Sequence, residues 1–210
     1  MFKQLPLTGL EEGEFTQITP EIRDLATKID QYGPTRNWSV PEKVSHFLMR
    51  KLSRRKRGEG NPAEFRNRTA SEIIADKDRR YSNGCSDDGI VFLALCRALN
   101  QPALYIETVR EEALEKSEEP WRDGHVFADV FVNGIWMPCN PKTLTSLVNY
   151  NLHGERYIPF ARGIDFSHLY IFNPQTEEYF SNPERNQIHT KKQHDARDIA
   201  TKYFGGWRNR

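Results

Sequence analysis

The sequence predicts an α+β fold in which a central helix, buried on every side, packs against an antiparallel sheet. Helical patterns fill the first half of the chain and strand patterns the second half, an order typical of α+β proteins. The central helix is indicated by the run from Ile90 to Leu99, which is apolar on nearly every side and must therefore be buried. The sheet is indicated by Asn133-Gly134, a turn between two apolar alternations that strongly favours a hairpin.

Length and composition are those of one globular domain with an elaboration at one end. The chain has 210 residues, more than the usual domain length of about 150 but too few for a second full core. Its 12 Phe, 8 Tyr and 4 Trp argue against disorder. Lys and Arg number 30 and Asp and Glu 29, so the net charge of +1 excludes a whole-molecule field for nucleic acid or an anionic membrane.

The sequence favours a cytoplasmic protein without a membrane partner. No apolar run with the length of a secretory signal core follows Lys3. The longest uncharged apolar stretch, Ile90 to Cys96, has seven residues, whereas a membrane span needs about 20. We therefore expect neither a signal peptide nor a membrane-spanning segment.

The spacing of cysteines and histidines argues against a disulfide framework and against a metal site. The three cysteines are an odd number and include no CxxC pair. Four histidines also lack the spacing of metal ligands: His153, His168, His189 and His194. We therefore expect no metal and no cofactor, and at least one cysteine is available as a working thiol.

Capping signals predict three helices before the central one. Thr19-Pro20 opens a helix over residues 20–31. Ser39 to Glu42 form a capping box that opens the second helix, and Thr69 to Glu72 form another that opens a short third one. Between these two boxes, six basic residues lie among the eight from Arg50 to Arg57, in a segment that we expect to be a loop.

The central helix is expected from Cys85 to Leu99, and strands follow it. Asp87 and Asp88 lie in its first turn, where acids suit the positive end of the helix dipole, and Asn100 can close its last turn. An acidic connection is expected over residues 111–120. Strands are predicted over residues 103–109, 125–132, 135–140, 168–172 and 178–180. A final helix is predicted over residues 194–204.

The hairpin register brings a histidine and an asparagine onto one face of the sheet. A two-residue turn at Asn133-Gly134 pairs Phe127 with Asn140. Because side chains alternate along a strand, His125, Phe127 and Asn140 share a face, and His125 and Asn140 are diagonal neighbours. Such diagonal positions lie about 7–8 Å apart, within reach of a hydrogen bond between an imidazole and a carboxamide. Cys139 points to the opposite face.

Cys85 is the best-placed nucleophile of the three cysteines. It lies at the start of the central helix, where unpaired backbone N–H groups and the helix dipole favour a thiolate over a thiol. Cys96 lies three turns further along the same helix, about 16 Å away, and is expected in the core.

These residues resemble the transglutaminase-like superfamily, whose core has a papain-like arrangement of a cysteine on a helix and a histidine and an acid on adjacent strands. The resemblance implies a recognisable core over residues 19–142, with residues 143–210 as a C-terminal elaboration of the same single domain, 1–210. The matching segments are Gly84-Cys85-Ser86-Asp87, Leu95 to Ala103, Gly124 to Phe131 and Gly134 to Pro141.

The resemblance implies a Cys-His-Asn triad of Cys85, His125 and Asn140, with Asn140 where the family usually has Asp. Such an enzyme transfers acyl groups at amide bonds of a peptide or protein substrate through a thioester, as a protease, amidase, deamidase or transglutaminase. We favour hydrolysis over cross-linking because water needs no second binding site. The backbone N–H of Cys85 is a natural oxyanion donor, and the family's use of an upstream aromatic makes Trp38 and Tyr81 candidates for the second donor.

Two functions of other classes stay open. The departure at Asn140 also fits a catalytically inactive module that binds or scaffolds with this fold. The basic run from Arg50 to Arg57 is a candidate nucleic-acid patch, but no aromatic residues interleave with it for base stacking, so we favour a solvated loop.

Overall fold

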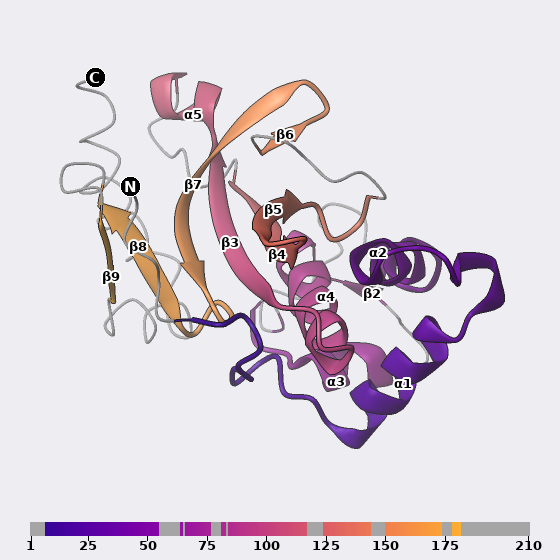
Figure 1. Ribbon diagram of the computed structural model, residues 1–210. Helices are drawn as coiled ribbons and strands as arrows, with labels where there is room; N and C mark the ends of the chain where they lie inside the picture. Colours follow the sequence, from indigo (N-terminus) through magenta and orange to yellow (C-terminus); the bar gives the residue numbers. More distant parts are fainter. Residues whose placement is uncertain are drawn as a thin grey trace.

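Four helices gather on one side of a curled antiparallel sheet, and a fifth short helix lies at the far end of its longest strands (Figure 1). The computed structural model describes residues 7–54, 64, 66–76, 81–82, 84–116, 124–143, 150–173 and 178–181. The helices are α1 (Pro20–Asp30), α2 (Val40–Lys51), α3 (Ala70–Ala75), α4 (Cys85–Ala98) and α5 (Glu111–Lys116), with a short 3-10 turn at Gly33–Thr35.

The three predicted helix starts are confirmed by their caps. The hydroxyl of Thr19 accepts a hydrogen bond from the backbone N–H of Ile22, at the start of α1. Capping boxes formed by Ser39 with Glu42 and by Thr69 with Glu72 open α2 and α3. These local hydrogen bonds satisfy backbone donors that have no partner inside a helix, which is why the sequence signals alone locate the helix starts.

The main sheet has the strand order β5-β4-β3-β7-β8-β9, and every neighbouring pair is antiparallel. The strands, in chain order, are β1 (Ser53–Arg54), β2 (Tyr81–Ser82), β3 (Ala103–Arg110), β4 (Gly124–Val132), β5 (Ile135–Cys139), β6 (Asn151–Leu152), β7 (Glu155–Gly163), β8 (Leu169–Asn173) and β9 (Glu178–Ser181). Strand β6 pairs with β7 beside this path, and β1 and β2 form a separate parallel pair.

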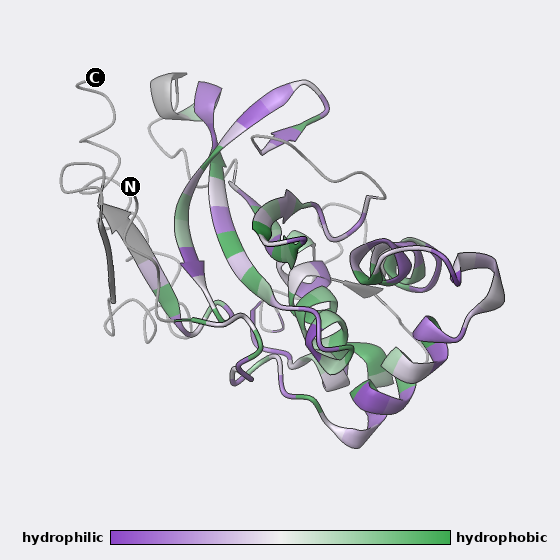
Figure 2. Ribbon diagram, viewed as in Figure 1, coloured by the Kyte–Doolittle hydropathy of each residue, from purple (hydrophilic) through white to green (hydrophobic). Residues whose placement is uncertain are grey.

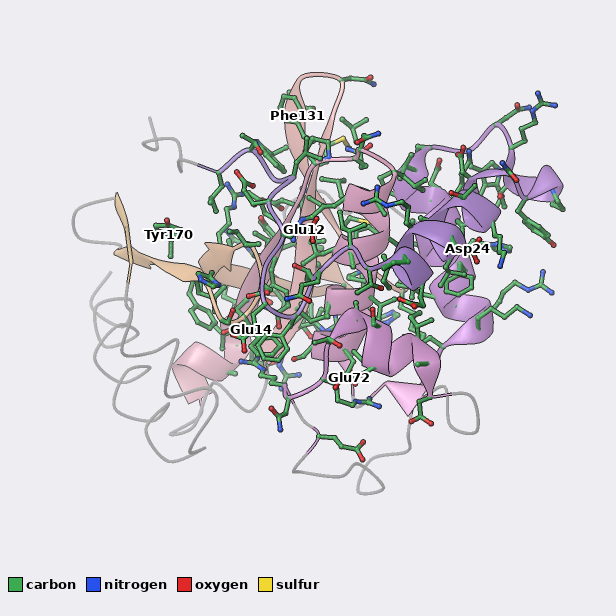
Figure 3. The ribbon with its side chains drawn as sticks, turned by 90° about the horizontal axis from the view of Figure 1, so that it is seen from below. Glu12, Glu14, Asp24, Glu72, Phe131 and Tyr170 are labelled. Carbon is green, nitrogen blue, oxygen red and sulfur yellow. The ribbon has the colours of Figure 1, made fainter. Side chains whose placement is uncertain are left out.

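The β4–β5 hairpin has the predicted register. Val132 pairs with Ile135, and the ladder continues to Ala128 opposite Cys139. Asn133 and Gly134 have φ values of 51° and 85°, the left-handed values that a type I′ turn requires. Phe131 lies near the tip of this hairpin (Figure 3).

The strand β7 was not predicted, although it lies at the centre of the sheet. Its pairing with β3 contains a bulge, because Thr108 pairs with Pro159 whereas Glu107 pairs with Ala161. The extra residue, Phe160, breaks the strict alternation that identifies strands in a sequence. Proline is tolerated in a sheet at such a bulge, but in a sequence it argues against a central strand.

Three other expectations differ from the structure or lie beyond it. Glu111–Lys116 form the helix α5 where we expected an irregular acidic connection. Ser53–Arg54 form the strand β1 within the expected basic loop. The rest of the basic run, residues 55–57, and the final helix expected over 194–204 lie outside the described residues.

The buried helix α4 lies at the centre of the core, as the sequence predicts. Twelve of its fourteen residues are buried, and Figure 2 shows apolar residues concentrated on it. One face of the sheet packs against it through Tyr105, Val126, Ala128 and Val130. The opposite face carries a smaller apolar cluster around Phe127, so β4 is covered on both faces.

Arg97 is the one basic residue inside this buried helix, and its guanidinium is fully engaged. It donates hydrogen bonds to the backbone carbonyls of Gly9, Ala103 and Ile164 and to the hydroxyl of Thr16. Burial lowers the pKa of Arg97 to about 10, so it stays charged at neutral pH. The residue therefore binds the N-terminal segment, α4 and β3 together.

In the part of the chain that the structure describes, no helix has the length and apolar character needed to cross a lipid bilayer.

Candidate active site

Cys85 is the first residue of α4 and the partly exposed member of the three cysteines, none of which is in a disulfide. Cys96 is fully buried and Cys139 is 4% exposed. Burial raises the pKa of Cys139 to about 12 and that of Cys96 well above its usual value. The two buried cysteines are therefore thiols at neutral pH, and Cys96 lies in the core as predicted.

The packing of α4 places Cys85 near the beginning of β4. Gly89, one turn after Cys85, lies so close to the sheet that a Cβ atom there would be 2.8 Å from Cγ1 of Val126. At the other end of the helix, Arg97 bonds the carbonyl of Ala103, a residue that pairs with Val130. Because α4 and β4 therefore run in the same direction, the start of the helix lies at the end of β4 that carries His125.

Adding a methyl group at Gly89 is expected to force α4 away from β4. The variant Gly89→Ala should lose about 1–3 kcal/mol of unfolding free energy, because overpacking shifts side chains or backbone. Urea denaturation of Gly89→Ala, Val126→Ala and the double variant measures the effect as a double-mutant cycle. The double variant should recover part of the loss, and strictly additive losses would contradict this close contact.

The His125 imidazole packs on the sheet face that points away from α4. Its ring lies 4.8 Å from that of Phe127, edge to face, and 5.7 Å from that of Tyr157 on β7, measured between centroids. The predicted sharing of a face by His125 and Phe127 is therefore confirmed. Burial raises the pKa of Tyr157, and the charges of Glu155 and Cys85 raise it further. Tyr157 thus lies against the imidazole.

Asn140 follows β5 and is only 4% exposed. Its side-chain oxygen accepts a hydrogen bond of 3.3 Å from the backbone N–H of Lys142. The Lys142 ammonium lies 3.4 Å from a carboxylate oxygen of Asp88 and also donates to the carbonyl of Leu52. The turn that carries Asn140 is therefore bound to the first turn of α4. A hydrogen bond from Asn140 to His125 stays a prediction.

Two arginines that the sequence analysis missed surround the first turn of α4. Arg68 forms a buried ion pair with Asp87, the acid predicted in this turn. Arg66 donates from Nε to the hydroxyl oxygen of Ser86, at 3.2 Å, and its Nη1 lies 2.7 Å from Oε1 of Glu107. Glu107 is an acid in an otherwise mostly apolar strand, and that exception was the available signal for a buried charge partner.

The oxyanion candidates are placed differently from one another. Trp38 is 38% exposed and lies edge-on to the His46 ring, 5.3 Å away, beside the start of α2. The other end of α2 leads to Leu52, which contacts Lys142, and a helix of this length separates its ends by about 18 Å. The role of Trp38 as an oxyanion donor at Cys85 stays a prediction. Tyr81 lies in β2, and its side chain is outside the described residues.

Among the described residues, no group of three or more His, Cys, Asp or Glu side chains is arranged to hold a metal ion. The polar residues around Cys85 are instead joined in ion pairs between elements, such as Arg66 with Glu107 and Arg68 with Asp87. Cys85, His125 and these ion pairs can supply a thiol, an imidazole and fixed charges.

A comparison with solved structures finds a similar fold in the crystal structure of a "Putative Cysteine Protease from Cytophaga hutchinsonii". The two chains are 21% identical, with a TM-score of 0.51, over 75% of this chain and 46% of that chain. The likeness shows the mixed α+β fold, with helices packed on a curled antiparallel sheet, and this chain spans less than half of the other protein. No family model and no curated protein matches the sequence.

Proposed function

We propose that this protein is a cysteine-dependent acyl-transfer enzyme with a transglutaminase-like, papain-like core, acting on amide bonds of peptides or proteins. One observation carries the proposal. A partly exposed thiol begins a buried helix whose first two turns contact both the strand of His125 and the turn of Asn140. The name of the structurally similar protein, a cysteine protease, supports the same class of chemistry.

In the proposed reaction, His125 accepts the proton of the Cys85 thiol and the resulting thiolate attacks the amide carbonyl carbon. The backbone N–H of Cys85 stabilises the oxyanion, and one such donor contributes roughly 3–4 kcal/mol in the transition state. The imidazolium then protonates the departing amine, and a thioester remains on Cys85. Water resolves the thioester in a hydrolase, and an amine resolves it in a transglutaminase.

Asn140 has the role of orienting the imidazole in this proposal. A carboxamide oxygen can hold one tautomer and one ring orientation of a histidine, although it cannot stabilise the imidazolium by charge. The Asn140 side chain is buried in a turn that Lys142 binds to α4, so its position is set relative to Cys85 rather than to the hairpin alone.

A binding or scaffolding module without turnover is the alternative. The observation that favours it is the packing of the His125 imidazole against Phe127 and Tyr157, on the face away from α4. Catalysis requires the imidazole to approach the Cys85 sulfur around the end of the sheet, where β4 begins. The two functions therefore differ in whether His125 changes the reactivity of Cys85.

Alkylation by iodoacetamide separates the two functions. Between pH 6 and 7, Cys85 should be alkylated much faster than Cys139, whose buried thiol has a pKa of about 12, or Cys96. His125→Ala should slow the reaction of Cys85, and Asn140→Ala should slow it less. Peptide mapping by mass spectrometry gives the rate for each cysteine.

Equal alkylation rates for the three cysteines would count against an activated thiol. A fast reaction of Cys85 that His125→Ala leaves unchanged would favour the binding module. Release of peptides from fluorescein-labelled casein then measures hydrolysis, and incorporation of an added fluorescent amine into unlabelled casein measures amine transfer.

A further inference from the structure

Arg66 connects the first turn of α4 with the sheet through a buried guanidinium. Its side chain is 15% exposed and donates a hydrogen bond to Ser86, the residue after Cys85. It also forms an ion pair with Glu107, whose side chain is 5% exposed. The backbone of Arg66 has a φ of 54°, a left-handed conformation that costs energy for a residue with a side chain. Such strain persists where the surrounding contacts hold a residue in place, and it is frequent at functional sites.

The charge of Arg66 acts on the Cys85 thiol as well as on Glu107. Although burial lowers the pKa of Arg66, the negative charges of Glu107, Tyr105 and Cys85 raise it above the usual value. Several ionisable groups lie on the elements around the first turn of α4, with His125 and Tyr157 on the sheet face that points away from it. They are Arg66 and Arg68 before α3, Tyr105 and Glu107 on β3, His125 on β4, Lys142 after β5 and Tyr157 on β7, with Asp87 and Asp88 on α4 itself.

Two other acids of this turn, Asp87 and Asp88, are also held in ion pairs. Asp87 pairs with Arg68, and Asp88 pairs with Lys142. Arg66 differs because its Nε bonds the residue next to Cys85. A cation that is bound to the neighbouring residue in a poorly solvated site favours the ionised form of a thiol.

We infer that Arg66 is a positioning residue that stabilises the thiolate of Cys85, and that Glu107 fixes the guanidinium while opposing part of its effect. The inference deepens the proposed function, on which its catalytic meaning rests. It concerns the ionisation of the thiol itself, however, and that is measured without any substrate.

Opposite responses of two variants test the inference. Arg66→Gln removes the positive charge, so the pH at which Cys85 becomes reactive should rise by roughly one unit, which makes alkylation at pH 6 about tenfold slower. Glu107→Gln removes the opposing negative charge and keeps a hydrogen-bonding side chain, so alkylation at pH 6 should become faster. The iodoacetamide rate for Cys85, measured from pH 5 to 9, gives both midpoints.

The direction in which each variant shifts the midpoint of Cys85 reactivity distinguishes an electrostatic role of Arg66 from a structural one. Loss of the contact between α4 and the sheet would shift the midpoint in the same direction in both variants, and that result would overturn the inference. A midpoint unchanged in Arg66→Gln would overturn it as well. Arg66→Lys keeps the charge and should retain most of the wild-type profile, whereas Lys28→Gln, at an exposed cation of α1, should leave the profile unchanged.

Arg66→Gln leaves Glu107 buried without its cation, which destabilises the fold. A double variant keeps the test decisive if Arg66→Gln folds poorly for this reason. Arg66→Gln with Glu107→Gln has no buried charge at this position, and its midpoint should lie between those of the single variants. A midpoint as high as that of Arg66→Gln would contradict the opposing role of Glu107. If the midpoints shift as expected but no amide substrate is turned over, the proposed function fails while the role of Arg66 stands.

Discussion

Replacing Cys85 with alanine is expected to abolish acyl transfer, with a loss of about 10⁴-fold or more, and to leave the melting temperature nearly unchanged. The loss is large because the sulfur would form the covalent intermediate, and no other group can replace it. Stability should hardly change because Cys85 is the partly exposed first residue of α4, and alanine is compatible with a helix start. Casein hydrolysis and thermal unfolding, measured on the same preparation, check both statements.

Cys96→Ala is the matched control for this variant. Cys96 lies on the same helix but is fully buried, so its truncation should cost about 1 kcal/mol of stability and leave activity largely intact. The reverse pattern, with Cys85→Ala destabilising and Cys96→Ala inactivating, would mean that Cys85 is a packing residue. Activity that survives in Cys85→Ala would end the thiol mechanism.

Removing the Arg68 side chain is expected to give the largest loss of stability among these variants. Arg68→Ala should cost about 3–5 kcal/mol, because it leaves the carboxylate of Asp87 buried without its cation. The carboxylates of Asp76 and Glu64 also lie within 3.6 and 3.8 Å of the Arg68 guanidinium, so three acids would face one another without it. Urea denaturation at pH 7 measures the loss.

The double variant Arg68→Ala with Asp87→Asn identifies the cause. It removes the stranded charge and should recover part of the lost stability. Lys28→Ala serves as the surface control, since Lys28 and Asp24 form an exposed ion pair and exposed pairs contribute little. A loss in Arg68→Ala no larger than that in Lys28→Ala would show that the Arg68–Asp87 pair does not hold α4 in place.

The helices and the hairpin could be predicted because their signals are local. Thr19, Ser39 and Thr69 satisfy backbone donors a few residues away, and Asn133-Gly134 adopts the turn that its residue types favour. The strand β7 could not be predicted, because its central place depends on pairing with β3 and on a bulge beside Pro159. These depend on residues about fifty positions away in the sequence.

The candidate site likewise has a part that short-range sequence patterns predict and a part that they do not. The position of Cys85 at a helix start and the register that places His125 beside Phe127 follow from short-range patterns. The arginines that surround Cys85 do not, since Arg66 and Arg68 precede a capping box and look like ordinary surface residues in the sequence. Only the packing of α3 against α4, and of α4 against β3, buries them beside acids.

Short-range sequence patterns identify which residues can carry the chemistry: a thiol at the start of a largely apolar helix, and a histidine and an asparagine in one hairpin register. The tertiary structure decided their surroundings, because the close approach of Gly89 to Val126 sets where α4 meets the sheet. It also decided the charges at the thiol, since Arg66, Ser86 and Glu107 come from three separate segments. Electrostatic interactions act through space, so only folding reveals which charges lie near one another.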